Sequence, residues 1–145
     1  MPVLYLVLLT IHFLALALGV GTSFAMVTLG IASASLEPAE RRAFMLRAMA
    51  VSKNGSVGFL LLVLSGLGMF FMRGPASVFA AGGPAFHAKL TLVVITAGVL
   101  GYSQVLRKRA RVAGDAKAMA ALPKVGTALL LLSIAIVVAA VIAFQ

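Results

Sequence analysis

The chain contains no cysteine and only three acidic residues, Glu37, Glu40 and Asp115. Without cysteine it cannot form disulfides or thiolate metal sites, and it cannot use cysteine catalysis. All three acidic residues lie outside the long apolar stretches. These stretches therefore carry no carboxylate proton relay and no carboxylate metal cluster, and the chain offers no buried acid/base pair for hydrolysis. A glycine-rich phosphate-binding loop is absent from the sequence as well.

Charge is scarce throughout the chain. Only 10% of its 145 residues are charged and 63% are hydrophobic, whereas a soluble domain is about a quarter charged and about half apolar. Such a composition is typical of a membrane protein. A bilayer core of about 30 Å needs about 20 helical residues, and four apolar stretches meet this length. They predict membrane-spanning helices at residues 3–30, 49–72, 85–106 and 123–144.

The four predicted helices leave no room for a soluble domain, so we expect a single domain over residues 1–145. The apolar runs are continuous, without the alternation that an outer-membrane barrel requires. Short connections favour antiparallel neighbouring helices. The predicted fold class is therefore all-α, an integral membrane four-helix up-and-down bundle with helix extensions on the cytoplasmic side.

Local signals predict how these extensions begin. Ser35 is a candidate helix cap, and Pro38 suits the first helical turn. We expect the helix that begins here to run on into the membrane and to be loosened at Asn54-Gly55. Asp115 is expected to cap a short inner helix, and Pro123 either bends that helix or starts the fourth span. The segment 73–86, rich in Gly and Pro, is expected to be the outer loop.

The net charge of +9 is unevenly distributed between the loops. Basic residues collect in cytoplasmic loops of membrane proteins. Here they concentrate around the connection before the second predicted span and around the connection after the third. This pattern predicts a multi-pass protein of a bacterial-type inner membrane with both termini outside. Loop charge of this kind attracts anionic lipid head groups, so the predicted partner is the lipid bilayer and not nucleic acid. Ten of the twelve Lys and Arg residues lie in the first and third loops: Arg41, Arg42, Arg47, Lys53, Arg107, Lys108, Arg109, Arg111, Lys117 and Lys124.

Small residues recur at helical spacing in the predicted spans. Ala15, Gly19 and Ser23 are four residues apart and lie on the same side of the first helix as His12. Such stripes allow two helices to pack closely. They also leave room for a flat ligand beside His12, and the sequence alone leaves both interpretations open.

His12 lies in the apolar stretch LTIHFLALALG. It is about nine residues from the outer end of its helix, or roughly 13 Å at 1.5 Å per residue. Ionisable residues inside membrane segments are candidate functional residues. One interpretation is a neutral imidazole that bonds a backbone carbonyl or a Ser/Thr hydroxyl. The other is axial ligation of a haem iron, for which histidine is a common ligand.

His87 and Lys89 open the third predicted helix, in FHAKL. Two residues on a regular helix are about 200° apart, so both cannot point to the centre of the bundle. Lys89 either extends to the outer surface or pairs with a haem propionate. His87 is either an interface residue or, together with His12, an iron ligand. Met69 and Met72 are alternative ligands near the same outer face.

The order of these features resembles that of a known membrane family. A histidine early in the first helix is followed by E-R-R, by F-H-A-K-L at the start of the third helix, and by G-Y and a basic loop. This layout is similar to the HemJ-type protoporphyrinogen oxidases and, in outline, to the broader CopD-like membrane proteins. The resemblance covers nearly the whole chain in layout but few residues in detail. It implies that His12 binds b-type haem and that Lys89 contributes to function.

The sequence departs from the family pattern at three places. The chain has no tryptophan, whereas the family typically has one shortly after the first histidine. The family's P-R-L-F-V-Y-H-like stretch is replaced by V-T-L-G-I-A-S-A-S, and Gly101-Tyr102 is followed by Ser103 where the family has histidine. These departures weaken the expectation of oxidase activity more than the expectation of haem binding. We therefore interpret the chain as a divergent relative of the family.

The predicted function is that of a b-type haem-binding membrane protein with a role in electron transfer or haem-linked redox chemistry near the outer face. One alternative is a HemJ-like protoporphyrinogen oxidase that passes electrons to a quinone or another haem protein. Another is a haem-free accessory subunit whose small-residue faces pack against a partner. A homo-oligomer and a redox partner protein are both compatible with the sequence.

Overall fold

The computed structural model describes residues 3–143, which form five α-helices and one short 3-10 turn, with no strand in that range. Four helical segments are long and apolar enough to cross a membrane. The predicted all-α four-helix membrane bundle is therefore confirmed. The elements are α1 (Val3–Ala32), η1 (Ser33–Ser35), α2 (Pro38–Ala48), α3 (Ser52–Arg73), α4 (Pro75–Val112) and α5 (Ala116–Ala143).

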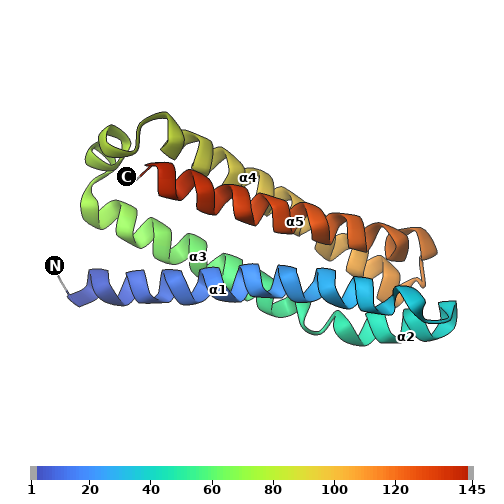
Figure 1. The fold of residues 1–145 in the computed structure, drawn as a ribbon. Helices are drawn as coiled ribbons and strands as arrows, with labels where there is room; N and C mark the ends of the chain where they lie inside the picture. The colour runs from blue at the N-terminus through green and yellow to red at the C-terminus, as the bar shows by residue number, and fades with distance from the viewer. Residues whose placement is uncertain (1–2, 144–145) are drawn as a thin grey trace.

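The bundle consists of two antiparallel helix pairs. Helix α1 packs along α3, and α4 packs along α5 (Figure 1). The pairs meet mainly through α1 and α5, whereas α3 and α4 contact each other little although they are consecutive in the chain. The two pairs lie closest near α2 and diverge toward the end at which the chain termini lie (Figure 1).

The contact between α1 and α3 depends on glycine. A Cβ atom added at Gly58 would lie 2.9 Å from the backbone nitrogen of Gly19 and 3.0 Å from the carbonyl oxygen of Ala15. The two backbones therefore touch at this point, and Ala15 and Gly58 are both buried. This contact supports the packing interpretation for part of the small-residue stripe on α1.

The start of α2 confirms one predicted signal and corrects another. Pro38 occupies the first turn of the helix, as predicted. Ser35 is not the cap: it ends the 3-10 turn, and the cap position belongs to Glu37, whose side chain makes no capping hydrogen bond. The reason is that proline at the first helical position fixes where the helix begins, which leaves Ser35 two residues too early.

The interruption between α2 and α3 lies earlier than predicted. Helix α2 ends at Ala48 and α3 begins at Ser52, with a tight turn between them in which the Val51 N–H donates to the Ala48 carbonyl at 3.0 Å. Asn54-Gly55 lies within α3, so the expected loosening at that site is wrong. Gly55 instead allows close approach to α1, because a Cβ there would lie 3.1 Å from Thr22 Cγ2.

The segment expected to be an irregular outer loop is mostly helical. Helix α4 starts at Pro75 and is interrupted at Gly83, whose φ of 49° and ψ of −149° are not helical. A positive φ of this kind is easily adopted only by glycine. Pro84 follows directly and opens the second part of α4, since proline suits a first helical turn. The break separates a short first helical part of α4 from its long apolar second part.

The start of α5 agrees with the sequence. The backbone N–H groups of Lys117 and Ala118 donate to Oδ1 of Asp115 at 2.9 Å and 3.1 Å, so Asp115 caps the helix as predicted. Pro123 lies inside α5, which continues unbroken from Ala116 to Ala143. The expected short helix and the fourth span are thus one helix, and the expectation that Pro123 could start the fourth span is wrong.

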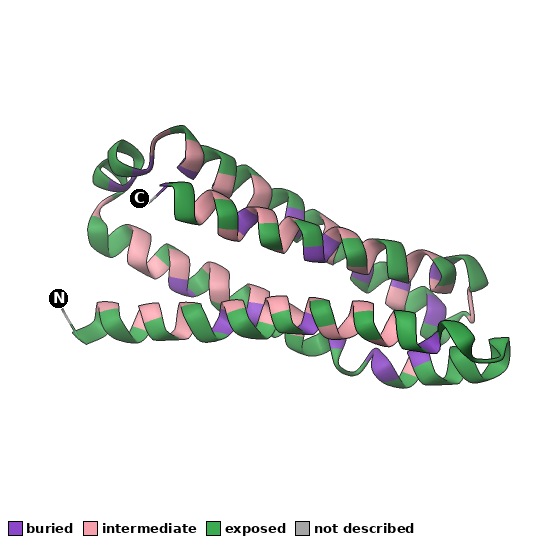
Figure 2. Ribbon diagram, viewed as in Figure 1, coloured by how far each residue is buried: buried purple, intermediate pink, exposed green. Residues whose placement is uncertain are grey.

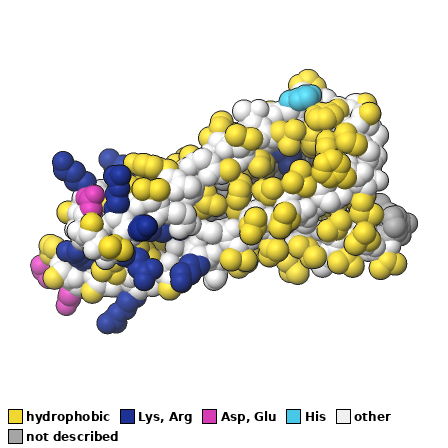
Figure 3. All heavy atoms as spheres, turned by 180° about the vertical axis from the view of Figure 1, so that it is seen from behind, with side chains coloured by type: hydrophobic (Ala, Val, Ile, Leu, Met, Phe, Trp, Pro, Cys, Tyr) yellow, Lys and Arg dark blue, Asp and Glu magenta, His cyan; other side chains and the backbone are white. Residues whose placement is uncertain are grey.

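The surface has the polarity of a membrane protein. Few residues are buried within the bundle, and the exposed ones follow the outer sides of all the long helices (Figure 2). Large apolar side chains such as Val94 and Phe71 are among the most exposed. Charged side chains gather at the end that contains α2, and the rest of the face seen in Figure 3 is mainly apolar. This separation is typical of a helix bundle whose apolar sides contact lipid.

Candidate functional site

The imidazole of His12 is anchored between α1 and α3. Its Nδ1 lies 2.9 Å from the hydroxyl oxygen of Ser65, a residue of α3 that is buried. The Ser65 hydroxyl donates its only hydrogen to the Leu61 carbonyl at 2.6 Å. While that hydrogen is engaged with a carbonyl, the hydroxyl oxygen can accept from an N–H at Nδ1 of His12, and the 2.9 Å separation fits such a bond. The Ser65 hydroxyl also lies 3.2 Å from the Leu62 carbonyl oxygen.

This arrangement fixes which atom of His12 is available for chemistry. When Nδ1 carries the hydrogen, Nε2 carries the lone pair of the neutral ring. A histidine that binds a metal almost always donates its other N–H to a neighbouring oxygen, which orients the ring and fixes the tautomer. The bond to Ser65 has this form. In the neutral form of this tautomer, Nε2 of His12 can donate an electron pair.

The surroundings of His12 combine a glycine and a cation. A Cβ at Gly66 would lie 3.3 Å from Cε1 of His12, so glycine leaves room for the ring against α3. The Lys89 ammonium, on α4, is close enough to act electrostatically on His12. Lys89 is partly buried and has interactions of its own within the bundle. His12 and Lys89 thus lie within electrostatic range of each other although they are 77 positions apart in the chain.

His87 has a different environment. Its side chain is exposed, and its ring stacks on Phe79 with centroids 5.2 Å apart. Phe79 in turn packs edge to face against Phe70 and Phe86. His87 therefore belongs to an aromatic cluster around the break in α4. Lys89, two residues further along, is the less exposed of the two, as the 200° rotation between them allows.

Arg107 is a residue that we interpreted from sequence only as loop charge. It lies in α4 and its side chain turns into the bundle, where it lines a central cavity of about 70 Å³. Its Nη1 is buried and has no hydrogen-bond partner within residues 3–143. A signal was present in the sequence: Thr96, Ser103 and Arg107 are separated by seven and four residues, which places them on one face of a helix.

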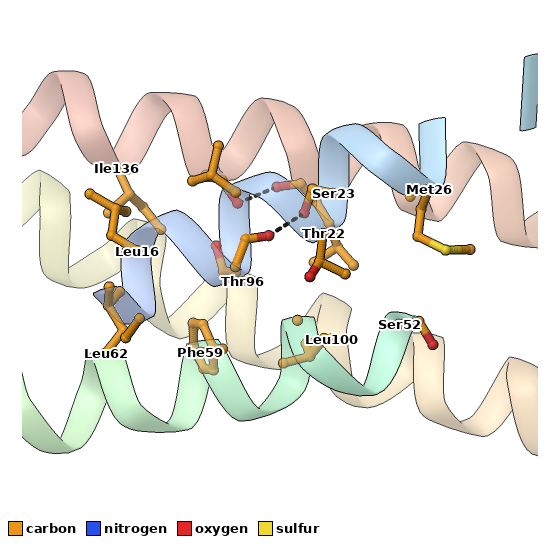
Figure 4. A pocket seen from close by; sticks show the side chains of 18 of the residues that line it. Leu16, Thr22, Ser23, Met26, Ser52, Phe59, Leu62, Thr96, Leu100 and Ile136 are labelled. Carbon is orange, nitrogen blue, oxygen red and sulfur yellow. Dashed lines mark hydrogen bonds between the residues drawn. The ribbon is translucent and has the colours of Figure 1, made fainter. Parts of the chain in front are cut away.

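The cavity lies where all four long helices meet. Its walls consist of apolar side chains and of residues that carry hydroxyl groups. Figure 4 shows the apolar side chains of Leu16, Phe59, Leu62 and Ile136 in this lining. Five lining residues carry hydroxyls, each of which donates to a backbone carbonyl three or four residues earlier in the chain: Thr22, Ser23, Ser52, Thr96 and Ser133. The oxygen lone pairs of these hydroxyls remain available as acceptors.

The side chains available within residues 3–143 restrict which metals this chain can bind. Within that range no group of three or more His, Asp or Glu side chains could hold a metal ion. His12 is therefore not part of a site with three such protein ligands within that range. One imidazole suits a metal whose other positions are already filled, as they are in haem.

The fold and these sites define a class: a four-helix membrane bundle with a histidine hydrogen-bonded between two of its apolar helices and basic residues gathered at the end that contains α2. No protein-family model matches the chain, and no curated protein or solved structure is significantly similar to it.

Proposed function

We propose that this chain is a multi-pass membrane protein that binds b-type haem through His12 and transfers electrons near the outer face of the bilayer. The observation that carries the proposal is the bond between His12 Nδ1 and Ser65, which leaves Nε2 as an electron-pair donor. The donor set fits one axial position of haem, since a single oriented imidazole is what that position requires. When bound, haem supplies reversible one-electron chemistry.

The residues around His12 have separate roles in this proposal. Ser65 would hold the imidazole in one orientation through the bond at Nδ1. Lys89 supplies a positive charge on the α4 side, which would pair with a propionate carboxylate. Gly66 keeps the α3 side of the ring uncrowded. The apolar side chains of the bundle exclude water from the iron-binding nitrogen.

The position of His12 favours a macrocycle between the helix pairs over one in the central cavity. The cavity of about 70 Å³ does not include His12 in its lining, and pockets for organic ligands are about 300–1,000 Å³. The helix pairs diverge on the side of the chain termini (Figure 1), and α3 and α4 contact each other little. Binding of a flat ligand beside His12 would require α4 to move away from α3.

We further propose an inner, cytoplasmic membrane of bacterial type with both termini outside, because the basic residues concentrate at the opposite end of the bundle. An alkaline phosphatase fused after Gln145 should therefore be active, and a cytoplasm-only reporter fused there should be silent. A fusion at Ala113, between α4 and α5, should give the reverse result. Activity of the cytoplasmic reporter at Gln145 would refute this topology.

Lys89→Met is expected to weaken haem retention or shift the haem potential, with a smaller effect than the loss of His12. The variant keeps the length of the side chain and removes its charge. A partly exposed charge pair contributes about 0–1 kcal/mol, so we expect a several-fold change at most. The measurement is haem content together with a redox titration. Lys108→Met, at an exposed residue of the inner end, is the matched control, and equal results for both variants would exclude the propionate role.

The sixth ligand is tested at His87, which the sequence left open as either an interface residue or an iron ligand. Because the His87 ring is exposed and stacks on Phe79, we expect His87→Ala to keep its haem and its low-spin spectrum. A methionine, Lys89 or a partner chain would then supply the sixth bond. Conversion to a five-coordinate, high-spin spectrum would instead assign that bond to His87.

A further inference from the structure

The guanidinium of Arg107 is a charge without a counter-charge. Arginine stays protonated in proteins, and Nη1 of Arg107 is buried with no hydrogen-bond partner within residues 3–143. The three acidic residues do not supply one: Glu37 and Glu40 are exposed on and before α2, and Asp115 caps α5. A buried charge is costly unless it is paired or hydrogen-bonded. The site therefore calls for an anionic partner from outside the chain.

The cavity beside Arg107 limits the size of that partner. Its volume of about 70 Å³ is far below the roughly 300–1,000 Å³ of pockets for organic ligands. It exceeds the roughly 30 Å³ that one water molecule occupies in the liquid. The space suits one small ion accompanied by water, and it excludes a nucleotide, a sugar or a lipid head group.

The rest of the lining suits a hydrated ion. The hydroxyl hydrogens of Thr22 and Ser133 are engaged with the Leu18 and Leu129 carbonyls, both at 2.7 Å. Their oxygens can accept hydrogen bonds from water, and water in turn can donate to an anion. One guanidinium is the single charge in the lining, so an ion of charge −1 balances it.

We propose that the central cavity is a binding site for a small monovalent anion of halide size, held by the Arg107 guanidinium between the two helix pairs. The site lies at the inner end of the bundle, where α1 and α3 approach α4 and α5. It is separate from His12, which does not line the cavity. The proposal does not depend on haem binding.

The test is the thermal stability of the purified full-length protein in sodium chloride and in sodium gluconate at equal ionic strength. Gluconate is too large for the cavity. A ligand that binds only the folded state stabilises it by RT ln(1 + [L]/Kd), where [L] is the free ligand concentration. We expect chloride at about ten times its dissociation constant to raise the Tm of the native chain by roughly 3–6 °C.

Arg107→Gln should abolish this response, whereas Arg109→Gln, at an exposed residue of the same helix, should keep it. An equal chloride response in all three proteins, or none in the native chain, would overturn the proposal. Bromide-soaked crystals of the native chain provide a measurement that needs no variant. An anomalous peak within hydrogen-bond distance of Arg107 Nη1 is expected, and water alone in that position would refute the site.

Discussion

His12→Ala is expected to remove haem from the protein or to weaken its binding at least about tenfold. The substitution deletes the iron-binding nitrogen and leaves a void in the bundle. Loss of an outer-shell partner alone typically costs about 10–100-fold in metal affinity, so loss of the ligand itself should cost at least as much. The measurement is the ratio of Soret absorbance to protein, with haem quantified as its pyridine complex.

Two companion variants separate ligation from a general disturbance of α1. Thr10→Ala removes an exposed hydroxyl that bonds only the Leu6 carbonyl of the same helix, and it should leave haem content unchanged. Ser65→Ala removes the acceptor that orients His12, and it should reduce affinity without abolishing binding. Unchanged haem content and spectrum in His12→Ala would exclude His12 as an essential ligand.

Gly58→Ala is expected to destabilise the bundle by about 1–3 kcal/mol, the usual cost of overpacking. The new methyl group would lie 2.9 Å from the Gly19 nitrogen and 3.0 Å from the Ala15 carbonyl oxygen. Both atoms belong to the backbone of α1, so the clash is relieved only if the two helices move apart. Alanine is the better helix former by about 1 kcal/mol, and this gain offsets part of the loss.

Gly98→Ala provides the matched control for this prediction. Gly98 is exposed on α4, and a Cβ there would have nothing within 4 Å. The control keeps the gain in helix propensity and lacks the clash, so it should be neutral or slightly stabilising. Unfolding in mixed micelles measures both variants. A Gly58→Ala protein as stable as Gly98→Ala would show that α1 and α3 do not pack in this register.

The fold could be predicted because its main determinants are local. Continuous apolar runs of membrane-spanning length specify helices, and short connections specify antiparallel neighbours. Pro38 and Asp115 marked two helix starts correctly, since proline and a capping carboxylate act on their own turn. The prediction that Ser35 caps α2 was wrong because serine can cap a helix only at the residue directly before its first turn. The prediction of a loosened helix at Asn54-Gly55 was wrong because Gly55 serves the close contact with α1. The sequence alone does not distinguish a glycine that permits helix contact from one that permits bending.

The candidate site could be predicted only in part. His12 was recognisable as a polar residue in an apolar run. Its partner Ser65 is 53 positions away, and the pairing depends on the register between α1 and α3, which no local pattern specifies. Arg107 was overlooked because it borders a basic loop, although its spacing from Thr96 and Ser103 indicated an inward face.

The most direct test of the central claim is the absorbance spectrum of the native protein, purified from cells with an ample supply of haem. The account predicts a Soret band and, after reduction, split α and β bands of a b-type haem. It also predicts that this pigment stays with the protein through size-exclusion chromatography. A folded, monodisperse protein with no absorbance in the haem region would contradict the proposal.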